Sequence, residues 1–557
     1  MNHFKIALAS AGLLLAHAAS APMLAAPSIG RIVNNASYTP DGLPGSGIGL
    51  GSIFAVFGSE LGPGQLTQSD YPLPTTLAGT SLRISVGGAE VSAFIIYTSA
   101  TQVAAILPSN ASPGRALARL TYNGQTSEPF AFEIVRNGPG LFTLNSAGSG
   151  PAVLTDANFS VITLTNPARP GQTVIAWATG ISPANGPDNE RPAVFDPPIT
   201  VEVFVGGQLA NVRFRGRAPC CAGLDQIVFD IPANVSGCSV SLAVRAGGNT
   251  SNFSSIAVAP QGQTTCSDPN GFSSSDLNNV PAGGFRMGVI TLQRSTAKIT
   301  APVVGTVESQ TDIGAATFTR FEPGFLVRSR GLGDASFGSC AVYSFQGEAS
   351  TADPVPITFL DAGAQLTITG PGGSRTMTRQ QEVYSGQLGM GITGLPGGIP
   401  GGGAGQPLFL NAGDYSVAGA GGRDVGAFTA RIRIPQRFNW TNQDATTRVQ
   451  RSQDLTLTWE GGDPPNEYVT VSGSSSRSNP RGGVTFYCTG PASAGRLVVP
   501  SVVLSALPPS ENIQGTPTGT LLIYNAPTSL NGRFSAPGID LGVITYGTSF
   551  VKNLPYE

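Results

Sequence analysis

The sequence predicts an all-β protein made of tandem immunoglobulin-like β-sandwiches followed by further β-rich domains. Gly and Pro, which interrupt regular structure, make up 117 of the 557 residues, so long helices are not expected. Apolar and polar residues alternate over short stretches along most of the chain. In addition, residues 32–135 and 150–259 are similar to each other in sequence, which indicates two domains of one kind.

Short strands joined by tight turns are indicated within each repeat. Residues 81–86, 116–122 and 201–205 alternate apolar and polar side chains with a period of two, and Gly-Gly or Asn-Gly follows each of them as a hairpin turn. About seven such strands in roughly 110 residues, with a turn signal every 8 to 12 residues, are typical of an immunoglobulin-like sandwich.

The two repeats align over several motifs in one order. Phe57 of the first repeat corresponds to Trp177 of the second, and we expect Trp177 to fill the core, with stacking against a ligand as the alternative. The matching motifs are Gly51–Leu61 with Gly171–Ile181, Val86-Gly-Gly with Val205-Gly-Gly, Gln102-Val103 with Gln226-Ile227, and Leu107-Pro108 with Ile231-Pro232.

A family resemblance rests on four segments of these repeats: Ile32–Tyr38, Gly51–Gly58, Pro72–Ser81 and Asp225–Pro232. Residues 30–259 resemble the tandem immunoglobulin-like module of a large paralogous family of uncharacterised acidobacterial secreted proteins, and more distantly IPT/TIG-type domains. The resemblance implies the fold and export, and it implies no activity, because that family has no established function. The adjacent Cys220 and Cys221 depart from a minimal version of the module.

Changes of composition divide the chain into domains and a linker. We expect sandwiches at 28–136 and 137–260, a polar linker rich in turn-forming residues at 261–284, a β-rich domain at 285–436 and another sandwich at 437–557. Alternation predicts strands at 427–434 and at 455–459, where Leu455, Leu457 and Trp459 share one face.

The N-terminus has the pattern of a secretory signal peptide, which we place at 1–26. Lys5 precedes a short apolar run and then small residues, and cleavage after Ala18, Ala21 or Ala26 stays open. The apolar run is shorter than the roughly 20 residues of a membrane-spanning helix, so no membrane insertion is expected after cleavage. The sequence therefore predicts an exported protein, extracellular or periplasmic.

Six cysteines without a C-x-x-C pair favour disulfides over a zinc site in such a compartment. The alpha carbons of Cys220 and Cys221 are about 3.8 Å apart, below the usual range for a disulfide, so we expect each to pair elsewhere. Cys238 and Cys266 are their nearest candidates, which leaves Cys340 and Cys488 for each other. Sequence alone does not choose among the 15 possible connectivities.

The residue types also limit the chemistry. Both histidines, His3 and His17, lie in the predicted signal peptide, so histidine-based catalysis and histidine-ligated metals are excluded from the mature chain. A net charge of −2 without a basic block excludes nucleic acid as a partner. We expect no catalysis, no cofactor and no metal.

The densest acidic and aromatic cluster is a weak candidate for a ligand-binding loop. It consists of Trp459, Glu460, Asp463, Glu467 and Tyr468, after a predicted strand, where loops often carry function. Two such carboxylates across a glycosidic bond would be needed for carbohydrate hydrolysis. The alternative interpretation is a charged hairpin tip.

These observations favour a non-catalytic binding, adhesion or structural protein at or outside the cell. Its expected partner is a polysaccharide or another surface protein, recognised through loops or strand edges. The competing hypothesis is a carbohydrate-active enzyme, or its accessory carbohydrate-binding module, that uses carboxylates.

Overall fold

A computed structural model describes residues 26–269, 284–301, 305–322, 335–346, 357–393, 406–479, 481–528 and 532–557 of the chain. Almost all regular structure in these ranges is strand, and the helical segments are the turn η1 (Ala492–Ala494) and the short helix α3 (Ser501–Leu504). The prediction of an all-β fold with tandem immunoglobulin-like sandwiches is confirmed. The predicted signal peptide, apart from its last residue, and most of the predicted linker lie outside the described residues.

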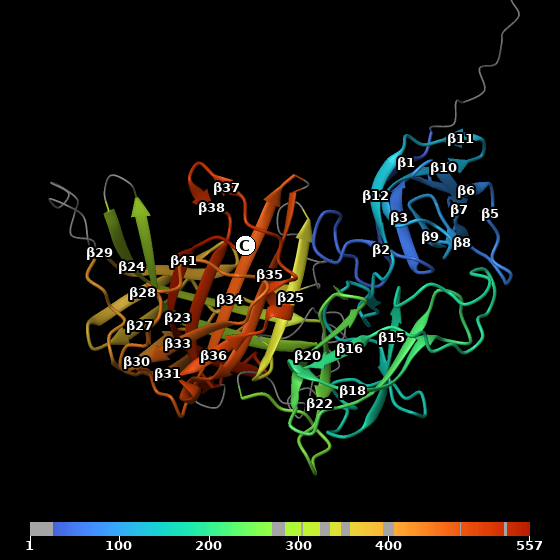
Figure 1. Ribbon diagram of the computed structural model, residues 1–557. Coiled ribbons are helices and arrows are strands. Elements are labelled where there is room, and N and C mark those ends of the chain that lie inside the picture. Colours follow the sequence, from blue (N-terminus) through green and yellow to red (C-terminus); the bar gives the residue numbers. More distant parts are fainter. Residues whose placement is uncertain are drawn as a thin grey trace, which may run out of the picture.

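The first sandwich consists of two sheets that face each other across one core (Figure 1, blue). Leu82 and Ile84 from one sheet and Phe54 and Val56 from the other fill that core. One sheet has the order β1 (Ser28–Asn34), β3 (Ile53–Ser59), β9 (Gln102–Ile106), β8 (Phe94–Thr98), β4 (Thr67–Gln68). The other has the order β2 (Ile48–Gly49), β12 (Phe130–Val135), β10 (Gly114–Tyr122), β6 (Thr80–Val86), β5 (Thr76–Leu77), with β7 (Ala89–Ser92) on β6 and β11 (Gln125–Thr126) on β10.

The second sandwich repeats this plan (Figure 1, green). Val174, Ile227 and Phe229 meet Val203 and Leu242 in its core. One sheet has the order β13 (Gly140–Leu141), β15 (Thr173–Thr179), β19 (Asp225–Asp230), β18 (Asn211–Arg217), with β14 (Leu154–Thr155) on β15. The other has the order β17 (Gln208–Leu209), β16 (Val201–Val205), β20 (Gly237–Ala246), β21 (Asn249–Thr250), with β22 (Ser254–Val258) on β20.

The C-terminal region contributes fourteen of the described strands to one sheet. Twelve of these strands form a path in the order β25 (Ser339–Gln346), β35 (Arg481–Pro491), β34 (Glu467–Ser478), β39 (Thr520–Pro527), β41 (Leu541–Asn553), β23 (Phe285–Ala301), β24 (Gly305–Phe321), β29 (Val383–Thr393), β28 (Gly373–Gln380), β27 (Gln365–Gly370), β30 (Gly413–Gly419), β31 (Phe428–Ile434). Beside them lie β26 (Ile357–Phe359) on β24, β40 (Arg533–Phe534) on β41, the three-stranded sheet β32 (Asn439–Trp440), β33 (Leu455–Glu460), β36 (Arg496–Val499), and the pair β37 (Asn512–Ile513), β38 (Thr516–Pro517).

That sheet contains strands from both sides of the domain boundary expected near residue 436, so the boundary does not separate two sheets. The long strand β41, near the C-terminus, pairs in parallel with β23, near the start of the region, and β25 pairs with β35. These pairings join residues about 150 to 250 positions apart, which local alternation does not reveal. The cores are nevertheless two, because Ile290 and Tyr546 belong to one apolar cluster and Phe486 to another.

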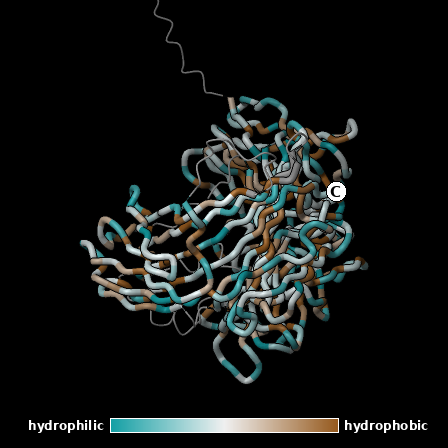
Figure 2. Tube along the Cα trace, turned by 90° about the vertical axis from the view of Figure 1, so that its left-hand side faces the viewer, coloured by the Kyte–Doolittle hydropathy of each residue, from teal (hydrophilic) through white to brown (hydrophobic). Residues whose placement is uncertain are grey.

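The sheet curls around the first of these clusters. Its last strand, β31, comes against β40, where the rings of Phe428 and Phe534 stack at 5.1 Å and Gly426 N donates to Pro537 O. Brown, hydrophobic stretches run through the packed strands, and teal stretches are frequent at the outer turns (Figure 2). Within the described residues no helix has the length and apolar character needed to cross a membrane.

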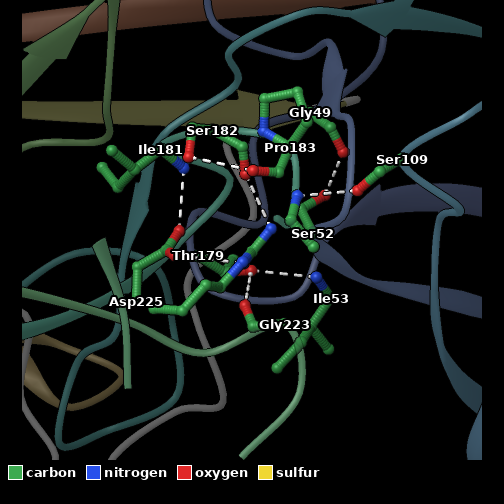
Figure 3. A network of polar contacts seen from close by, with 12 residues as sticks. Gly49, Ser52, Ile53, Ser109, Thr179, Ile181, Ser182, Pro183, Gly223 and Asp225 are labelled. Carbon is green, nitrogen blue, oxygen red and sulfur yellow. Dashed lines mark hydrogen bonds and ion pairs between the residues drawn. The ribbon is translucent and has the colours of Figure 1, made fainter. Parts of the chain in front are cut away.

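A buried polar network joins the two sandwiches (Figure 3). The Thr179 hydroxyl donates to Gly223 O at 2.6 Å and accepts from Ile53 N of the first sandwich at 2.9 Å. Close by, Arg217 and Asp225 form an ion pair at 3.0 Å with almost no exposure. Burial raises the pKa of Asp225, although the Arg217 charge acts in the opposite direction. Because each polar group has a partner, this junction holds the tandem module in one arrangement.

The cysteine pairs correct one prediction and confirm another. Cys220 and Cys221 are bonded to each other despite their alpha carbons being 3.8 Å apart, so the expectation that each pairs elsewhere is wrong. Cys238 and Cys266 consequently pair together, and Cys340 pairs with Cys488 as expected. The adjacent cysteines lie in the turn between β18 and β19, which accommodates the small ring that they close.

Candidate functional site

Trp177 lies on the outer face of the second sandwich, so the expectation that it fills the core is wrong. On β15 the core side chains are Val174, Ala176 and Ala178, whereas Ile175 and Trp177 alternate with them and are half-buried. Strand geometry places alternate side chains on opposite faces, which leaves Trp177 on the side away from the core.

Apolar side chains continue this face across three strands. Val228 of β19 lies opposite Ile175, and Phe214 of β18 lies opposite Val228, all half-buried and outside the core cluster. Neighbouring strands are about 4.8 Å apart, so the row spans roughly 10 Å. We call the aromatic face the surface formed by Phe159, Ile175, Trp177, Phe214 and Val228.

Phe159 is its most exposed member, with 64% of its surface accessible. It lies in the turn after β14, and its ring centroid is 6.3 Å from that of Trp177. Its φ of 61° is in the left-handed region, which costs an L-residue with a large side chain about 1 kcal/mol or more. Hydrogen bonds from the Asn158 and Ser160 amides to Asp156 Oδ1 hold this turn.

Polar groups lie beside the rings. Thr155 Oγ1 accepts from Trp177 Nε1 at 3.2 Å, and Gln226 lies opposite Trp177 on β19. At the end of the row, Asp230 accepts from Arg213, Thr173 and Asn211. The hydrogen bonds from Arg213 and then Thr173 lower the pKa of Asp230 from 3.8 to about 2. The face thus combines aromatic rings with amide, hydroxyl and ionic groups.

The equivalent residue of the first sandwich, Phe57, is likewise half-buried but has different neighbours. Phe57 also points away from the core, but the Arg31 guanidinium lies 4.1 Å from its ring centroid and Tyr38 packs at 6.3 Å. Gln102, which lies opposite Phe57, donates from Nε2 to Tyr97 Oη at 2.7 Å. Its counterpart Gln226 makes no side-chain hydrogen bond to any described residue, so the amide in the second sandwich is available.

The predicted acidic and aromatic loop has a different arrangement. Trp459 is buried in the core of the C-terminal region, and its Nε1 donates to Ala492 O at 2.8 Å. Tyr468 is half-buried, with its ring 6.2 Å from that of Phe337. Glu460 is exposed and accepts from Asn439 Nδ2 at 3.4 Å.

Glu467 is only 2% exposed, and its buried carboxylate holds this loop through hydrogen bonds. Its carboxylate accepts from Asp463 N at 2.9 Å and from the Tyr546 hydroxyl. Burial and the neighbouring Glu467 charge raise the pKa of Tyr546 well above its usual value. Asp463 in turn accepts from Asn466 Nδ2, so both carboxylates bind their own turn and do not face each other across a cleft.

The described residues contain no group of three or more side chains that would ligate a metal. Asp268, within the predicted linker, accepts from Cys238 N at 2.8 Å, and burial raises its pKa. That carboxylate therefore has a structural partner.

Sequence reasoning missed the aromatic face because both faces of β15 are apolar. Val174, Ala176 and Ala178 alternate with Ile175 and Trp177, so alternation alone does not tell which set is inside. A usable signal was present: a strand that is apolar on both faces in a two-layer sandwich presents one of them to the outside.

Comparisons with known proteins give no family for the chain. No protein-family model and no curated protein matches the chain. Among solved structures, it is similar to the plexin A4 extracellular region (domains 1 to 8), with 13% identity over 40% of this chain and 17% of that one, at a TM-score of 0.16.

Two further solved structures are similar at the same level. SGBP-B of the Bacteroides ovatus mixed-linkage glucan utilization locus, in complex with a mixed-linkage heptasaccharide, has 10% identity over 62% of this chain and 71% of that one, at a TM-score of 0.19. Immunoglobulin domains 1–4 of sidekick-1 have 11% identity over 93% of this chain and 98% of that one, at a TM-score of 0.11. At these TM-scores the likenesses carry no argument about the fold or the activity of this chain.

Proposed function

We propose that this chain is an exported, non-catalytic binding protein that recognises a polysaccharide through the aromatic face of its second sandwich. The observation that carries the proposal is the contact of the exposed Phe159 with the half-buried Trp177, beside the unoccupied amide of Gln226. Export and membership of the acidobacterial secreted family belong to the same proposal. The three disulfides support the first, because disulfides persist in oxidising compartments.

The chemistry of the face favours a sugar chain. One face of a pyranose ring carries C–H groups, which pack on the electron-rich face of an aromatic ring. Its hydroxyls need planar donors and acceptors at the edge of that ring, which the amide of Gln226 supplies. A flat, open sheet face also suits a long polymer better than an enclosed small molecule, which requires a concave pocket.

Absence of catalysis is part of the proposal. The mature chain that we infer contains no histidine. Of the acidic residues that the competing enzyme hypothesis would use, Glu467 is buried and bound to Tyr546 and to the backbone of its own turn. The first sandwich and the C-terminal region would act as rigid supports that position the second sandwich.

The test is binding of the oxidised mature chain to an array of soil, plant and bacterial polysaccharides, with the supernatants checked for released sugars. Trp177→Ala should weaken binding to any positive polysaccharide at least about tenfold, because central aromatic residues dominate interfaces. Phe57→Ala, at the equivalent position of the first sandwich, is the matched control and should leave binding unchanged.

Three results would overturn the proposal. Release of sugars that stops on Glu460→Gln or Asp463→Asn would establish the carboxylate enzyme instead. Equal losses for Trp177→Ala and Phe57→Ala would show that the aromatic face is not the site. Failure to bind any polysaccharide, together with capture of a purified surface protein through Trp177, would establish a protein partner.

A further inference from the structure

A pocket of about 230 Å³ lies between the second sandwich and the C-terminal region, away from the aromatic face. The second sandwich supplies Phe204 and Ala243 from β16 and β20, and Phe253 from the segment before β22. The C-terminal region supplies β25, β35, β36 and α3. Ala243 and Phe253 also belong to the apolar cluster of the C-terminal region, so the two bodies share one packed boundary around the pocket.

The inner wall of the pocket is apolar. It includes Leu497, Val502 and Val503, together with the bonded pair Cys340 and Cys488. Hydroxyl and backbone groups there already have partners: Ser339 Oγ accepts from Ser241 N, and Thr489 O accepts from Gly338 N. An apolar body entering this space would therefore displace water without leaving these groups unpaired.

A single charged side chain lines the same pocket. Arg496 begins β36, the outer strand of its three-stranded sheet, and it is exposed. Within the described residues it forms no ion pair, whereas Arg294, Arg379 and Arg433 on other strands of this region each pair with an aspartate. A guanidinium offers a carboxylate two parallel hydrogen bonds. The pocket thus joins an apolar interior to an uncompensated positive charge.

We propose that this pocket binds a small organic carboxylate whose apolar part is one ring or a short acyl chain. Arg496 receives the carboxylate, and the wall formed by Leu497, Val502 and Val503 packs on the apolar part. The volume fixes the size class: drug-sized ligands occupy about 300 to 1,000 Å³, whereas an apolar cavity of about 150 Å³ takes up benzene. This site is independent of the polysaccharide site and does not rest on it.

The test uses benzoate as the probe on the full mature chain, followed through the methyl resonances of Leu and Val. Benzoate should shift the signals of Leu497, Val502 and Val503 with a saturable dependence on concentration. Arg496→Gln, a change at an exposed position, should weaken benzoate binding about tenfold. Benzyl alcohol, which keeps the ring and lacks the charge, should bind both proteins equally.

Two controls locate the effect. Arg431→Gln changes another exposed arginine on β31, far along the sheet, and should leave benzoate affinity unchanged. Ala243→Leu fills the pocket from β20 and should abolish the shifts from both probes. If Ala243→Leu does not fold, the comparison of Arg496→Gln with Arg431→Gln decides alone.

Absence of methyl shifts with benzoate up to its solubility would overturn the proposal. An equal benzoate affinity for Arg496→Gln and the unchanged protein would also overturn it, as would shifts that persist in folded Ala243→Leu. Polysaccharide binding measured on the same Arg496→Gln sample should be intact, which separates failure of this site from failure of the aromatic face.

Discussion

The two sandwiches have an aromatic residue at the same strand position, but the side chains around that residue differ. Phe57 is covered by Arg31 and Tyr38, and its cross-strand partner Gln102 is bound to Tyr97. Trp177 is accompanied by the exposed Phe159, and its partner Gln226 has no side-chain hydrogen bond to a described residue. The same strand register therefore places a half-buried aromatic side chain beside Arg31 and Tyr38 in one copy and beside the exposed Phe159 in the other.

The difference arises outside the aligned strands. Arg31 lies on the first strand of the first sandwich, whereas Phe159 lies in a turn after β14 of the second. Two further positions differ between the copies, because Asp225 and Asp230 occupy the places of Thr101 and Ile106. The first copy also contains no cysteine. The aligned strands supply the core in both copies, whereas the segments outside them determine which side chains lie on the outer face.

The largest expected effect on stability comes from replacing Asp225, whose counterpart in the first sandwich is Thr101. Asp225→Ala leaves the buried Arg217 charge unpaired and should lower the free energy of unfolding by about 3 to 5 kcal/mol. Denaturant unfolding followed by circular dichroism measures the loss. Asp196→Ala, which breaks a more exposed pair with Arg215, should cost less than about 1 kcal/mol. Equal losses would show that the junction pair is not special.

The second effect concerns the disulfide that braces only the second sandwich. Cys238 and Cys266 are 28 positions apart, so replacing both with Ser should lower the free energy of unfolding by about 3 to 4 kcal/mol. The bond between the adjacent Cys220 and Cys221 closes almost no loop, so replacing both with Ser should lower the free energy of unfolding by only about 1 kcal/mol. A larger loss for the adjacent pair, in the same denaturation assay, would contradict this ranking.

A third, smaller effect is a dependence on pH. The pKa of Asp230 is lowered from 3.8 to about 2 in the folded chain, so its contribution is present above about pH 4 and is lost as the pH falls toward 2. The size should be about 1 kcal/mol, because the partner Arg213 is 58% exposed and solvent screens the pair. Asp230→Asn should remove this part of the acid dependence, measured as denaturation midpoints at about pH 6 and about pH 2.5. An unchanged acid dependence would refute the assignment.

The smallest expected change in stability accompanies a change in binding. Phe159→Gly relieves the left-handed backbone but loses the contact with Trp177, so stability should stay within about 1 kcal/mol of the original. Polysaccharide binding should nevertheless weaken about fivefold, since a ring of the aromatic face is gone. Gln381→Gly, at another exposed position with φ of 56°, is the control for backbone relief and should leave binding intact.

Much of the fold was predictable because strand signals are local. Alternation at 81–86, 427–434 and 455–459 corresponds to β6, β31 and β33. The parallel pairing of β23 with β41 was not predictable, because it joins residues about 250 positions apart and depends on which of many similar strands meet. The adjacent disulfide escaped prediction for another reason: a statistical range of distances does not account for a turn that admits the exception.

The candidate sites divide in the same way. For the acidic and aromatic loop, sequence supplied the residues, and only tertiary structure decided that Trp459 and Glu467 turn inward. By itself the sequence determined the all-β class, the tandem repeat and the absence of histidine after the predicted signal peptide, because these depend on local periodicity and residue counts. Tertiary structure alone decided which apolar face is covered and where Arg496 meets an apolar pocket, because both depend on segments that are distant in the chain and adjacent in space.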